Sequence, residues 1–247
     1  MTKIYAHRGS SGTHPENTMI AFKEAERVGA DGIELDVHYT KDDELVVIHD
    51  NTVNRTTNGK GLIRSMTLAE LMELDAGKFF SRKFKGEKIP RLEEVLDWFQ
   101  TTNLLLNVEL KYVAIDYVNF EEKVLEELEK RDLLDRVVIS SFNHDGLKKI
   151  NGLNSKVETA ILYMERLYEP WNYARTVGAN AIHPYIDGVD PQLIAASEKS
   201  GCPVRVFTVN DEKMLGGLIQ VGSSGVITDF PERAIAVRES IRANGSK

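Results

Sequence analysis

Three carboxylates stand on two apolar runs of this sequence, where they could share a cation. Glu34 and Asp36 are two residues apart within the run 32–37, so in a strand they point to the same face with Cα atoms roughly 7 Å apart. Glu109 adds a third carboxylate near the end of the run 104–110. Oxygen ligands without cysteine favour a hard cation, Mg²⁺, Ca²⁺ or Mn²⁺, and the sequence leaves the choice open. The alternative is that these carboxylates face outward and pair with helix cations.

Two histidines stand where proton transfer could occur beside such a cation. His7 directly follows the apolar run 4–6, and His49 ends the run 45–49. Two imidazoles at one site permit one acid and one base, so we expect His7 and His49 to carry the proton transfers. For the other histidines we expect ordinary structural or surface positions at His14, His38 and His144, and leave His183 undecided.

Two cations favour an anionic substrate over a neutral sugar or peptide. The Arg8 guanidinium can hold phosphate oxygens in a bidentate manner, and Lys111 can add a point charge. Structural ion pairs are the alternative for both. Phe142 and Phe207, which follow or end apolar runs, either line a pocket for an apolar or glycerol-like group or pack in the core.

The elements that must position these residues alternate between strand and helix. Apolar runs rich in β-branched residues predict strands, and helical spacing of apolar residues between them predicts crossover helices, as in 92–99 and 120–128. Only residues 39–44 separate the second run from the third, which is too short for a parallel crossover and predicts a hairpin. The nine expected strands are 4–6, 32–37, 45–49, 104–110, 137–141, 159–163, 181–183, 204–209 and 225–228.

Removing the hairpin arm from the nine leaves eight strands, which close a (β/α)8 barrel with its reacting groups at the C-terminal strand ends. The length of 247 residues suits one such domain over 1–247. The stretch 50–91 is too long for one link and is expected to be an insertion near the mouth. We further expect Asn17 or Thr18 to cap the first helix, Asn119 with Glu122 to form a capping box, and Pro231 to begin the last helix.

The composition of the chain argues against nucleic-acid binding and against a membrane-spanning segment. A net charge of −7 gives no general attraction to nucleic acid, and no apolar run approaches the roughly 20 residues of a membrane helix. Cys202 is the single cysteine and the N-terminus carries no apolar signal region, so we expect a soluble, cytoplasmic protein. The sequence does not indicate an oligomeric state.

Several motifs resemble the glycerophosphodiester phosphodiesterase family. They are AHRGSSGTHPENTMIAF, GIELDVHYTKDDELVVIHD, NRTTNGKG, NVELK, SSF, FTVND and GVITDFP, which together cover nearly the whole chain in order. The resemblance implies a TIM barrel with an insertion after the second strand, metal ligands at Glu34, Asp36 and Glu109, catalytic histidines at His7 and His49, and phosphate contacts at Arg8 and Lys111. Phe207 stands where the family often has tryptophan, and Ser223–Ser224 replace a common Val-Asp pattern.

The implied activity is metal-dependent hydrolysis of a small glycerophosphodiester to sn-glycerol 3-phosphate and an alcohol. The attacking oxygen would be water or the neighbouring glycerol hydroxyl, which gives a cyclic phosphate. Two other functions stay open, a lysophospholipase D-like activity on lysophospholipids and a noncatalytic phosphoester-binding barrel. Head-group preference does not follow from the resemblance.

Overall fold

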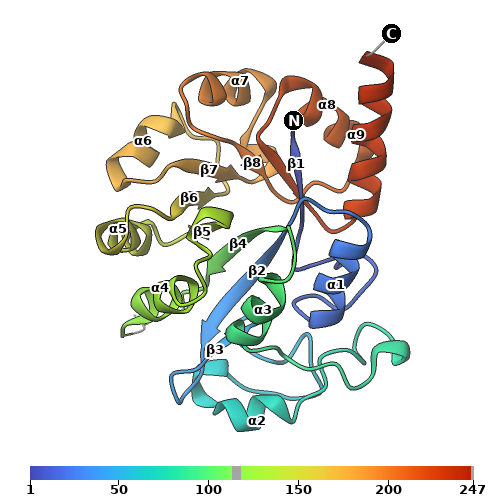
Figure 1. The fold of residues 1–247 in the computed structure, drawn as a ribbon, viewed down its shortest axis with the longest axis vertical. Coiled ribbons are helices and arrows are strands. Elements are labelled where there is room, and N and C mark those ends of the chain that lie inside the picture. The colour runs from blue at the N-terminus through green and yellow to red at the C-terminus, as the bar shows by residue number, and fades with distance from the viewer. Residues whose placement is uncertain (113–117, 246–247) are drawn as a thin grey trace.

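The fold is a (β/α)8 barrel, as the alternation of runs predicts. A computed structural model describes residues 1–112 and 118–245. The strands follow the order β7-β6-β5-β4-β2-β1-β9-β8, all parallel, and bridges from Ile182 to Val204 and from Tyr185 to Phe207 join the two ends (Figure 1). Its barrel strands are β1 (Lys3–Ala6), β2 (Gly32–Tyr39), β4 (Leu105–Leu110), β5 (Val137–Ser141), β6 (Glu158–Tyr163), β7 (Ala181–Pro184), β8 (Arg205–Val206) and β9 (Gly225–Thr228).

The third predicted strand is the return arm of a hairpin and not a barrel strand. β3 (Leu45–Val47) pairs antiparallel with β2, in the register Val37 with Val47, and lies off the barrel path. The turn needs a left-handed residue at Asp43, with φ 58°, and the Thr40 hydroxyl accepts from the Glu44 N–H. The hairpin sends the chain back over the end of β2, so His49 arrives at the mouth from outside the barrel wall.

Helices cover the outside of the barrel and follow the strands in turn. Their ranges are α1 (Met19–Arg27), α3 (Leu92–Phe99), α4 (Phe120–Glu129), α5 (His144–Leu153), α6 (Pro170–Val177), α7 (Pro191–Lys199), α8 (Glu212–Val221) and α9 (Pro231–Gly245), with short 3₁₀ turns at Leu134–Arg136 and Ile186–Gly188. Thr18 caps α1 and Pro231 begins α9, as expected. The capping box at Asn119 was wrong, because that residue is left-handed, with φ 58°, and its side chain makes no cap bond.

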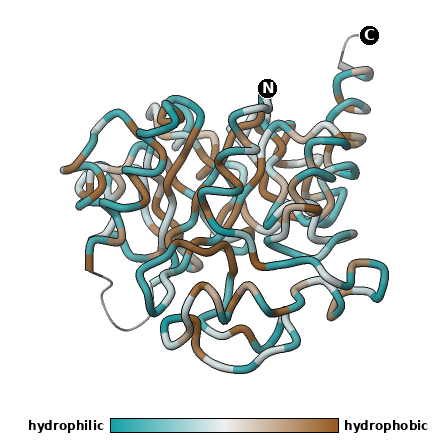
Figure 2. Tube along the Cα trace, turned by 60° about the horizontal axis from the view of Figure 1, so that its bottom comes forward, coloured by the Kyte–Doolittle hydropathy of each residue, from teal (hydrophilic) through white to brown (hydrophobic). Residues whose placement is uncertain are grey.

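The main core lies between the barrel wall and the helices. Residues at i, i+3, i+4 and i+7 of α3 are all buried, and the same periodicity buries one face of α4. Alternate strand residues point outward into this layer and inward into the barrel, so Ile33, Leu35 and Val37 join the apolar layer while Glu34 and Asp36 face the interior. In Figure 2 the apolar stretches of the trace accordingly gather in the barrel.

The segment between β3 and α3 has a small core of its own. It contains α2 (Leu68–Met72) and 3₁₀ turns at Ile63–Ser65 and Arg82–Phe84. A separate apolar cluster holds it on the barrel, formed by Val46, Ile48, Val53, Ile63, Leu71, Ala76 and Ile89. Thr67 and Glu70 form a capping box at α2. The segment lies at the end of the barrel where β1 and β2 finish, below the strands in Figure 1.

Among the residues that the structure describes, no helix combines the length and the apolar composition needed to cross a lipid bilayer.

Replacing Leu96 by alanine should lower the free energy of unfolding by about 2–5 kcal/mol, because the side chain is fully buried between α3 and the barrel. Denaturant unfolding followed by circular dichroism measures the change. Met214→Ala is the matched control, since that methionine is 49% exposed on α8 and should cost less than about 0.5 kcal/mol. Equal losses from the two variants would contradict the assignment of α3 to the core.

Candidate active site

Register brings the three predicted carboxylates together inside the barrel mouth. β2 and β4 pair with Asp36 beside Glu109, and Glu34 lies one inward position below. One oxygen from each of the three lies within 4.8 Å of the others. Glu34, Asp36 and Glu109 are 3%, 0% and 9% exposed, so the cluster concentrates up to three negative charges in a site nearly closed to bulk water.

Arg8 and Lys111 supply the positive charge within this cluster. The Lys111 ammonium lies 3.1 Å from Asp36 Oδ1 and 2.5 Å from Glu109 Oε1. The Arg8 backbone N–H donates to Glu34 Oε2 at 2.8 Å, and its guanidinium Nε is 3.4 Å from Asp36 Oδ2. Two cations therefore face three carboxylates, and one negative charge is left without a partner when all are ionised.

The three carboxylates differ in how readily they ionise. Burial raises the pKa of Glu34 well above its ordinary value, and the neighbouring charges of Asp36 and Glu109 add to the rise. Burial also raises the pKa of Glu109, to about 7, with Asp36 opposing its ionisation and Lys111 favouring it. Asp36 goes the other way, because Lys111, Arg8 and His49 together overcome its burial and hold its pKa well below the ordinary range. Asp36 is the carboxylate that stays ionised.

The donor set fits a hard divalent cation. Asp36 Oδ1 and Glu109 Oε1 are buried and accept no well-directed hydrogen bond, although the Lys111 ammonium lies near both. Carboxylate oxygens gathered without cysteine or histidine among them are the ligands that Mg²⁺ and Ca²⁺ prefer. A cation at this point would relieve the repulsion that raises the pKa values of Glu34 and Glu109. The structure thus contains a possible acidic metal site at the predicted residues.

Arg8 reaches the carboxylates through an unusual backbone turn. Arg8 and Gly9, which follow β1, both have positive φ, 56° and 78°. A side chain at position 9 would place its Cβ 2.6 Å from the backbone of Ala21, so the turn requires glycine. Asn17, also left-handed at φ 55°, donates from Nδ2 to Asp36 Oδ2 at 2.7 Å. The β1–α1 loop thereby delivers a cation and an amide to the same carboxylate.

His7 is oriented by an aspartate at the end of β9. Its Nδ1 lies 2.6 Å from Asp229 Oδ1, which leaves Nε2 for the barrel mouth. Asp229 is itself held, because Ser11 Oγ donates to Oδ1 at 3.0 Å and Asn210 Nδ2 donates to Oδ2 at 2.6 Å. These donors and His7 lower the pKa of Asp229 to about 2 against the effect of burial. An ionised Asp229 favours the imidazole tautomer with its proton on Nδ1.

His49 has the same kind of partner in its own neighbour. Its Nδ1 lies 2.7 Å from Asp50 Oδ1, and Arg55 fixes Asp50 with two hydrogen bonds of 2.8 and 2.9 Å. Arg55 also binds both carboxylate oxygens of Glu16, at 2.6 and 2.8 Å, and Glu16 accepts from Arg8 Nη1 at 2.9 Å. A continuous chain of charged contacts therefore joins His49 to Arg8, whose guanidinium faces Asp36.

The two predicted aromatics lie together at the mouth. Phe142 and Phe207 have ring centroids 6.1 Å apart, and Tyr185 lies 5.8 Å from Phe207. Phe142 is 47% exposed, so it does not belong to the core. It lines a cavity of about 410 Å³ that also touches His49, Glu109 and Lys111. The cavity offers room for a small organic group directly beside the charged cluster.

The remaining histidines lie outside the cluster of charges. His38 is buried with its Nε2 3.1 Å from the His49 carbonyl, so it supports the returning arm. His144 bridges Tyr173 and the Leu162 carbonyl, and the ring of His14 lies against Phe84. His183, which the sequence left undecided, is fully buried inside the barrel, 3.4 Å from Arg205.

Sequence reasoning missed the residues that orient the two histidines. Asp229 stood within the quoted motif GVITDFP and directly follows β9, so its place at a strand end was a usable signal. Asp50 adjoins His49, but a neighbour in sequence need not share a hydrogen bond. No sequence signal pairs Arg55 with Glu16, because 39 residues separate them and only the folded insertion brings them together.

A model of the glycerophosphoryl diester phosphodiesterase family matches residues 7–233 of the chain. Among curated proteins, a glycerophosphodiester phosphodiesterase of Bacillus altitudinis is 44% identical over 98% of this chain and 100% of its own length. A second protein of that name, from Caldanaerobacter subterraneus, is 42% identical over 95% of this chain and 96% of its own.

Solved structures agree over the full fold. A phosphodiesterase of Oleispira antarctica, solved in complex with the product sn-glycerol-3-phosphate, superimposes with a TM-score of 0.89 at 29% identity, covering 97% of both chains. A glycerophosphodiester phosphodiesterase of Agrobacterium tumefaciens superimposes with a TM-score of 0.83 at 29% identity, over 96% of this chain and 100% of that one.

Metal binding should stabilise the protein more at high pH than at low pH. The pKa of Glu109 is raised to about 7 in the fold, so without metal its contribution to stability is present at low pH and is lost as pH rises through about 7. A cation binds the ionised carboxylate and offsets that loss. At roughly a hundred times its Kd, a metal should raise Tm by about 5–10 °C near pH 8.

The rise in Tm near pH 5.5 should be less than half as large, and calorimetry with and without chelator measures both. The Glu109→Gln variant, which cannot ionise at this position, should show a smaller gain with a weaker pH dependence. A metal-induced gain that is identical at the two pH values would contradict the protonated state of the cluster.

Proposed function

The chain belongs to the glycerophosphoryl diester phosphodiesterase family, and from this premise we propose that it uses a divalent cation and two histidines to hydrolyse glycerophosphodiesters. The products are sn-glycerol 3-phosphate and an alcohol. The proposal is supported above all by one observation, the convergence of Glu34, Asp36 and Glu109 with two cations at the barrel mouth. The product bound to the Oleispira antarctica phosphodiesterase has the chemistry that such a site would accommodate.

Binding of the phosphodiester falls to Arg8, Lys111 and the cation. Both side chains are largely buried, 16% and 14% exposed, so their charges act in a medium that screens them weakly. Arg8 Nη1 donates to Glu16, and Nη2 donates no hydrogen bond to a described residue. That group and the Lys111 ammonium can hold nonbridging oxygens as negative charge grows on them during displacement.

Glu34, Asp36 and Glu109 would hold the cation, which supplies Lewis-acid stabilisation of a phosphoryl oxygen. Mg²⁺ and Ca²⁺ are the ions that we propose, with Mn²⁺ as a further candidate. Asp36 is ionised throughout the neutral range, whereas Glu34 and Glu109 must lose protons to coordinate. Lys111 stays positively charged beside Asp36 and Glu109, since they raise its pKa despite its burial.

His7 and His49 exchange the protons. Asp229 and Asp50 hold the two Nδ1 atoms, so each Nε2 is available to the mouth. Burial lowers the pKa of His49, which keeps the ring neutral at pH 7 and able to accept a proton. One imidazole takes the proton of the attacking oxygen, and the other gives a proton to the departing alcohol. The two histidines can take these roles in either order.

The attacking oxygen is water or the neighbouring hydroxyl of the glycerol. Attack by the hydroxyl would give a cyclic phosphate that a second step opens. Single-turnover reactions followed by phosphorus NMR separate the two routes, because only attack by the glycerol hydroxyl produces a cyclic intermediate.

A lysophospholipase D-like activity is a second candidate. The exposed Phe142 ring beside Phe207 gives the mouth an apolar wall, which an acyl chain could contact. A noncatalytic phosphoester-binding protein is opposed by the presence of both histidines, each with its aspartate. We also propose a cytoplasmic location, since Cys202 is a buried free thiol and no disulfide is possible with one cysteine.

Alanine at His7 or at His49 should lower kcat about 10²–10⁴-fold, because each replacement removes a proton-transfer group. Asp229→Asn should cause a smaller loss, since the imidazole stays in place but loses the partner that sets its tautomer. Initial rates of glycerol 3-phosphate release measure these effects. His14→Gln is the matched control because its ring lies against Phe84, and it should keep nearly full activity. Full activity of either alanine variant would remove that histidine from the mechanism.

Chelation should abolish turnover, and one divalent ion should restore it at the lowest concentration. A coupled assay for glycerol 3-phosphate, run on glycerophosphocholine, glycerophosphoethanolamine and a lysophospholipid, tests metal and substrate together. Release from the first two identifies the glycerophosphodiester activity, while preference for the lysophospholipid favours the second candidate. Undiminished turnover in excess chelator would eliminate the metal from the proposal.

A further inference from the structure

Residues 77–88 form a strongly cationic loop on a protein of opposite net charge. The segment reads GKFFSRKFKGEK and carries a net charge of +4, in a chain whose net charge is −7. We call it the cationic loop. All five of its basic side chains are exposed, namely Lys78, Arg82, Lys83, Lys85 and Lys88.

None of these five cations forms an ion pair with any residue that the structure describes, whereas most arginines of the barrel do. Burial raises the pKa of Glu87, the loop's one acid, and this carboxylate forms no ion pair with a described residue. Asp75, next to the loop, uses its carboxylate on the backbone N–H groups of Gly77, Lys78 and Gly86. The Lys83 ammonium lies 5.0 Å from the centroid of the Phe84 ring, and the other four basic side chains are exposed without an ion pair to a described residue.

Two adjacent aromatic rings stand among these charges. Phe79 and Phe80 are 40% and 39% exposed, with ring centroids 6.4 Å apart. Phe80 also contacts the buried Phe84, 5.8 Å away, whereas Phe79 makes no other aromatic contact among the described residues. Exposing two neighbouring phenylalanines costs free energy in water, and cations around aromatic rings are typical of surfaces that rest in a membrane interface.

The loop is held rigidly in this presentation. The 3₁₀ turn Arg82–Phe84 is capped by Ser81, the Ala76 N–H donates to the Glu87 carbonyl at 2.7 Å, and Phe84 packs against His14 of the β1–α1 loop at 5.0 Å. A side chain at Gly77 would clash with the Phe84 carbonyl, so the tight approach needs glycine. Little conformational entropy remains to be lost when such a loop meets a flat surface.

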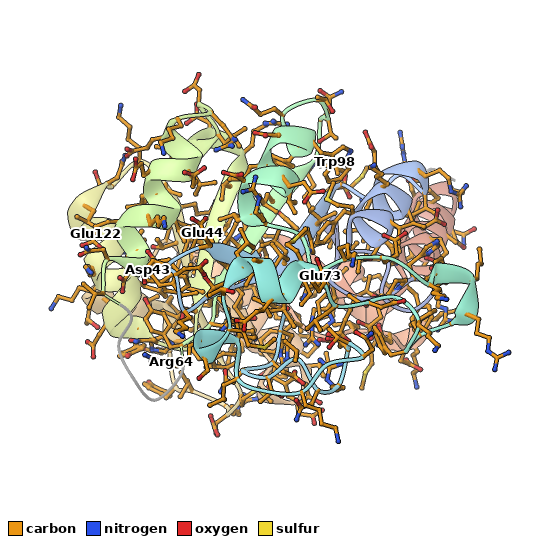
Figure 3. All side chains as sticks on the ribbon, turned by 90° about the horizontal axis from the view of Figure 1, so that it is seen from below. Asp43, Glu44, Arg64, Glu73, Trp98 and Glu122 are labelled. Carbon is orange, nitrogen blue, oxygen red and sulfur yellow. The ribbon has the colours of Figure 1, made fainter. Side chains whose placement is uncertain are left out.

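The loop lies at the same end of the barrel as the candidate active site. The β1–α1 loop, against which Phe84 packs, also carries Arg8 and Glu16. Figure 1 shows the segment that follows α2 projecting beside α1 at the end where β1 and β2 finish. In the view from below it projects at the edge of the molecule, away from the acidic side chains labelled at Asp43, Glu44 and Glu122 (Figure 3).

We propose that the cationic loop docks the protein on an anionic lipid surface, with Phe79 and Phe80 entering the interface. The cations would lie among the lipid phosphates, where each strengthens binding about fivefold near an anionic leaflet. Docking in this way turns the end of the barrel that holds the site toward the lipid. The binding step does not depend on the proposed hydrolysis, so either can fail while the other stands.

A nucleic acid would satisfy the same positive charges, but it is disfavoured by the two phenylalanines and by the rest of the chain. The remaining residues are net acidic, so a bulky polyanion that extends beyond a small loop would meet repulsion. A lipid surface contacts only the part of the protein that projects, and its apolar layer accepts the aromatic rings.

Vesicle co-sedimentation of the full chain tests the docking. Phosphatidylcholine vesicles should not bind it, whereas vesicles that also contain phosphatidylglycerol should, with the binding weakened by added salt. The triple variant Lys78→Gln, Arg82→Gln, Lys85→Gln should bind the anionic vesicles about 100-fold more weakly. Phe79→Ser should weaken binding about fivefold, because the partly exposed ring loses its place in the interface.

A matched control keeps the same change of net charge at another place. Lys148, Lys156 and Lys199 are exposed on α5, before β6 and on α7, and form no ion pair with a described residue. Their triple replacement by glutamine should alter vesicle binding less than about threefold. All variants should turn over a water-soluble glycerophosphodiester at the rate of the unaltered chain, because no exchanged residue belongs to the site. That rate also verifies that each variant is folded.

Equal weakening in the two triple variants would overturn the proposal, since it would show a general charge effect. Failure of the unaltered chain to bind anionic vesicles would also overturn it, and so would tight binding to duplex DNA that exceeds binding to the vesicles. Loss of vesicle binding by the loop variants, with turnover intact, supports docking. If the unaltered chain binds the vesicles but shows no turnover, the result counts against the proposed hydrolysis alone.

Discussion

The site depends on one unfavourable fact, the burial of three carboxylates within 4.8 Å of one another. Burial disfavours the ionised form of a carboxylate and neighbouring like charges add to this effect, so the pKa values of Glu34 and Glu109 rise. Lys111 and Arg8 both contact Asp36 directly, and they hold its pKa well below the ordinary range despite its burial. When all three carboxylates are ionised, these two cations leave one negative charge without a partner, which a divalent cation could neutralise.

The rest of the architecture serves to keep these charges in register. β2 and β4 place Asp36 beside Glu109, and the left-handed turn after β1 brings Arg8 over them. The hairpin arm β3 then returns His49 to the mouth, and Arg55 of the insertion ties its aspartate partner to Glu16. The insertion is therefore joined to the barrel by charged contacts as well as by its own apolar cluster. Moving one of these elements would disturb the positions of residues that we propose for proton transfer or phosphate binding.

The mouth presents different chemistry on its different sides. The charged cluster lies beside a cavity with the exposed Phe142 ring, and the cationic loop extends from the insertion near the β1–α1 loop. The first is the place where we propose that a small phosphodiester binds, and the second is exposed and forms no ion pair with a described residue. An acidic barrel that carries one basic loop will orient in the field of an anionic surface before it makes contact.

Much of this protein followed from its sequence, because local patterns have local causes. Alternation of apolar runs with helical spacing predicted the (β/α)8 barrel, and the link of residues 39–44 was too short for anything but a hairpin. The i, i+2 spacing placed Glu34 and Asp36 on one face, and the family resemblance that the motifs indicated is confirmed. The error at Asn119 was local as well, since its backbone is left-handed and its side chain makes no cap bond.

Only the tertiary structure decided how these residues are held. The pairing of His7 with Asp229 spans 222 residues and that of Arg55 with Glu16 spans 39, so no pattern along the chain could predict either. The pKa values likewise depend on burial and on charges from other strands, which exist only after the barrel closes. The sequence by itself determined which chemical groups stand at the strand ends. The fold determined their distances, and with them which carboxylate keeps its charge and which imidazole nitrogen faces the mouth.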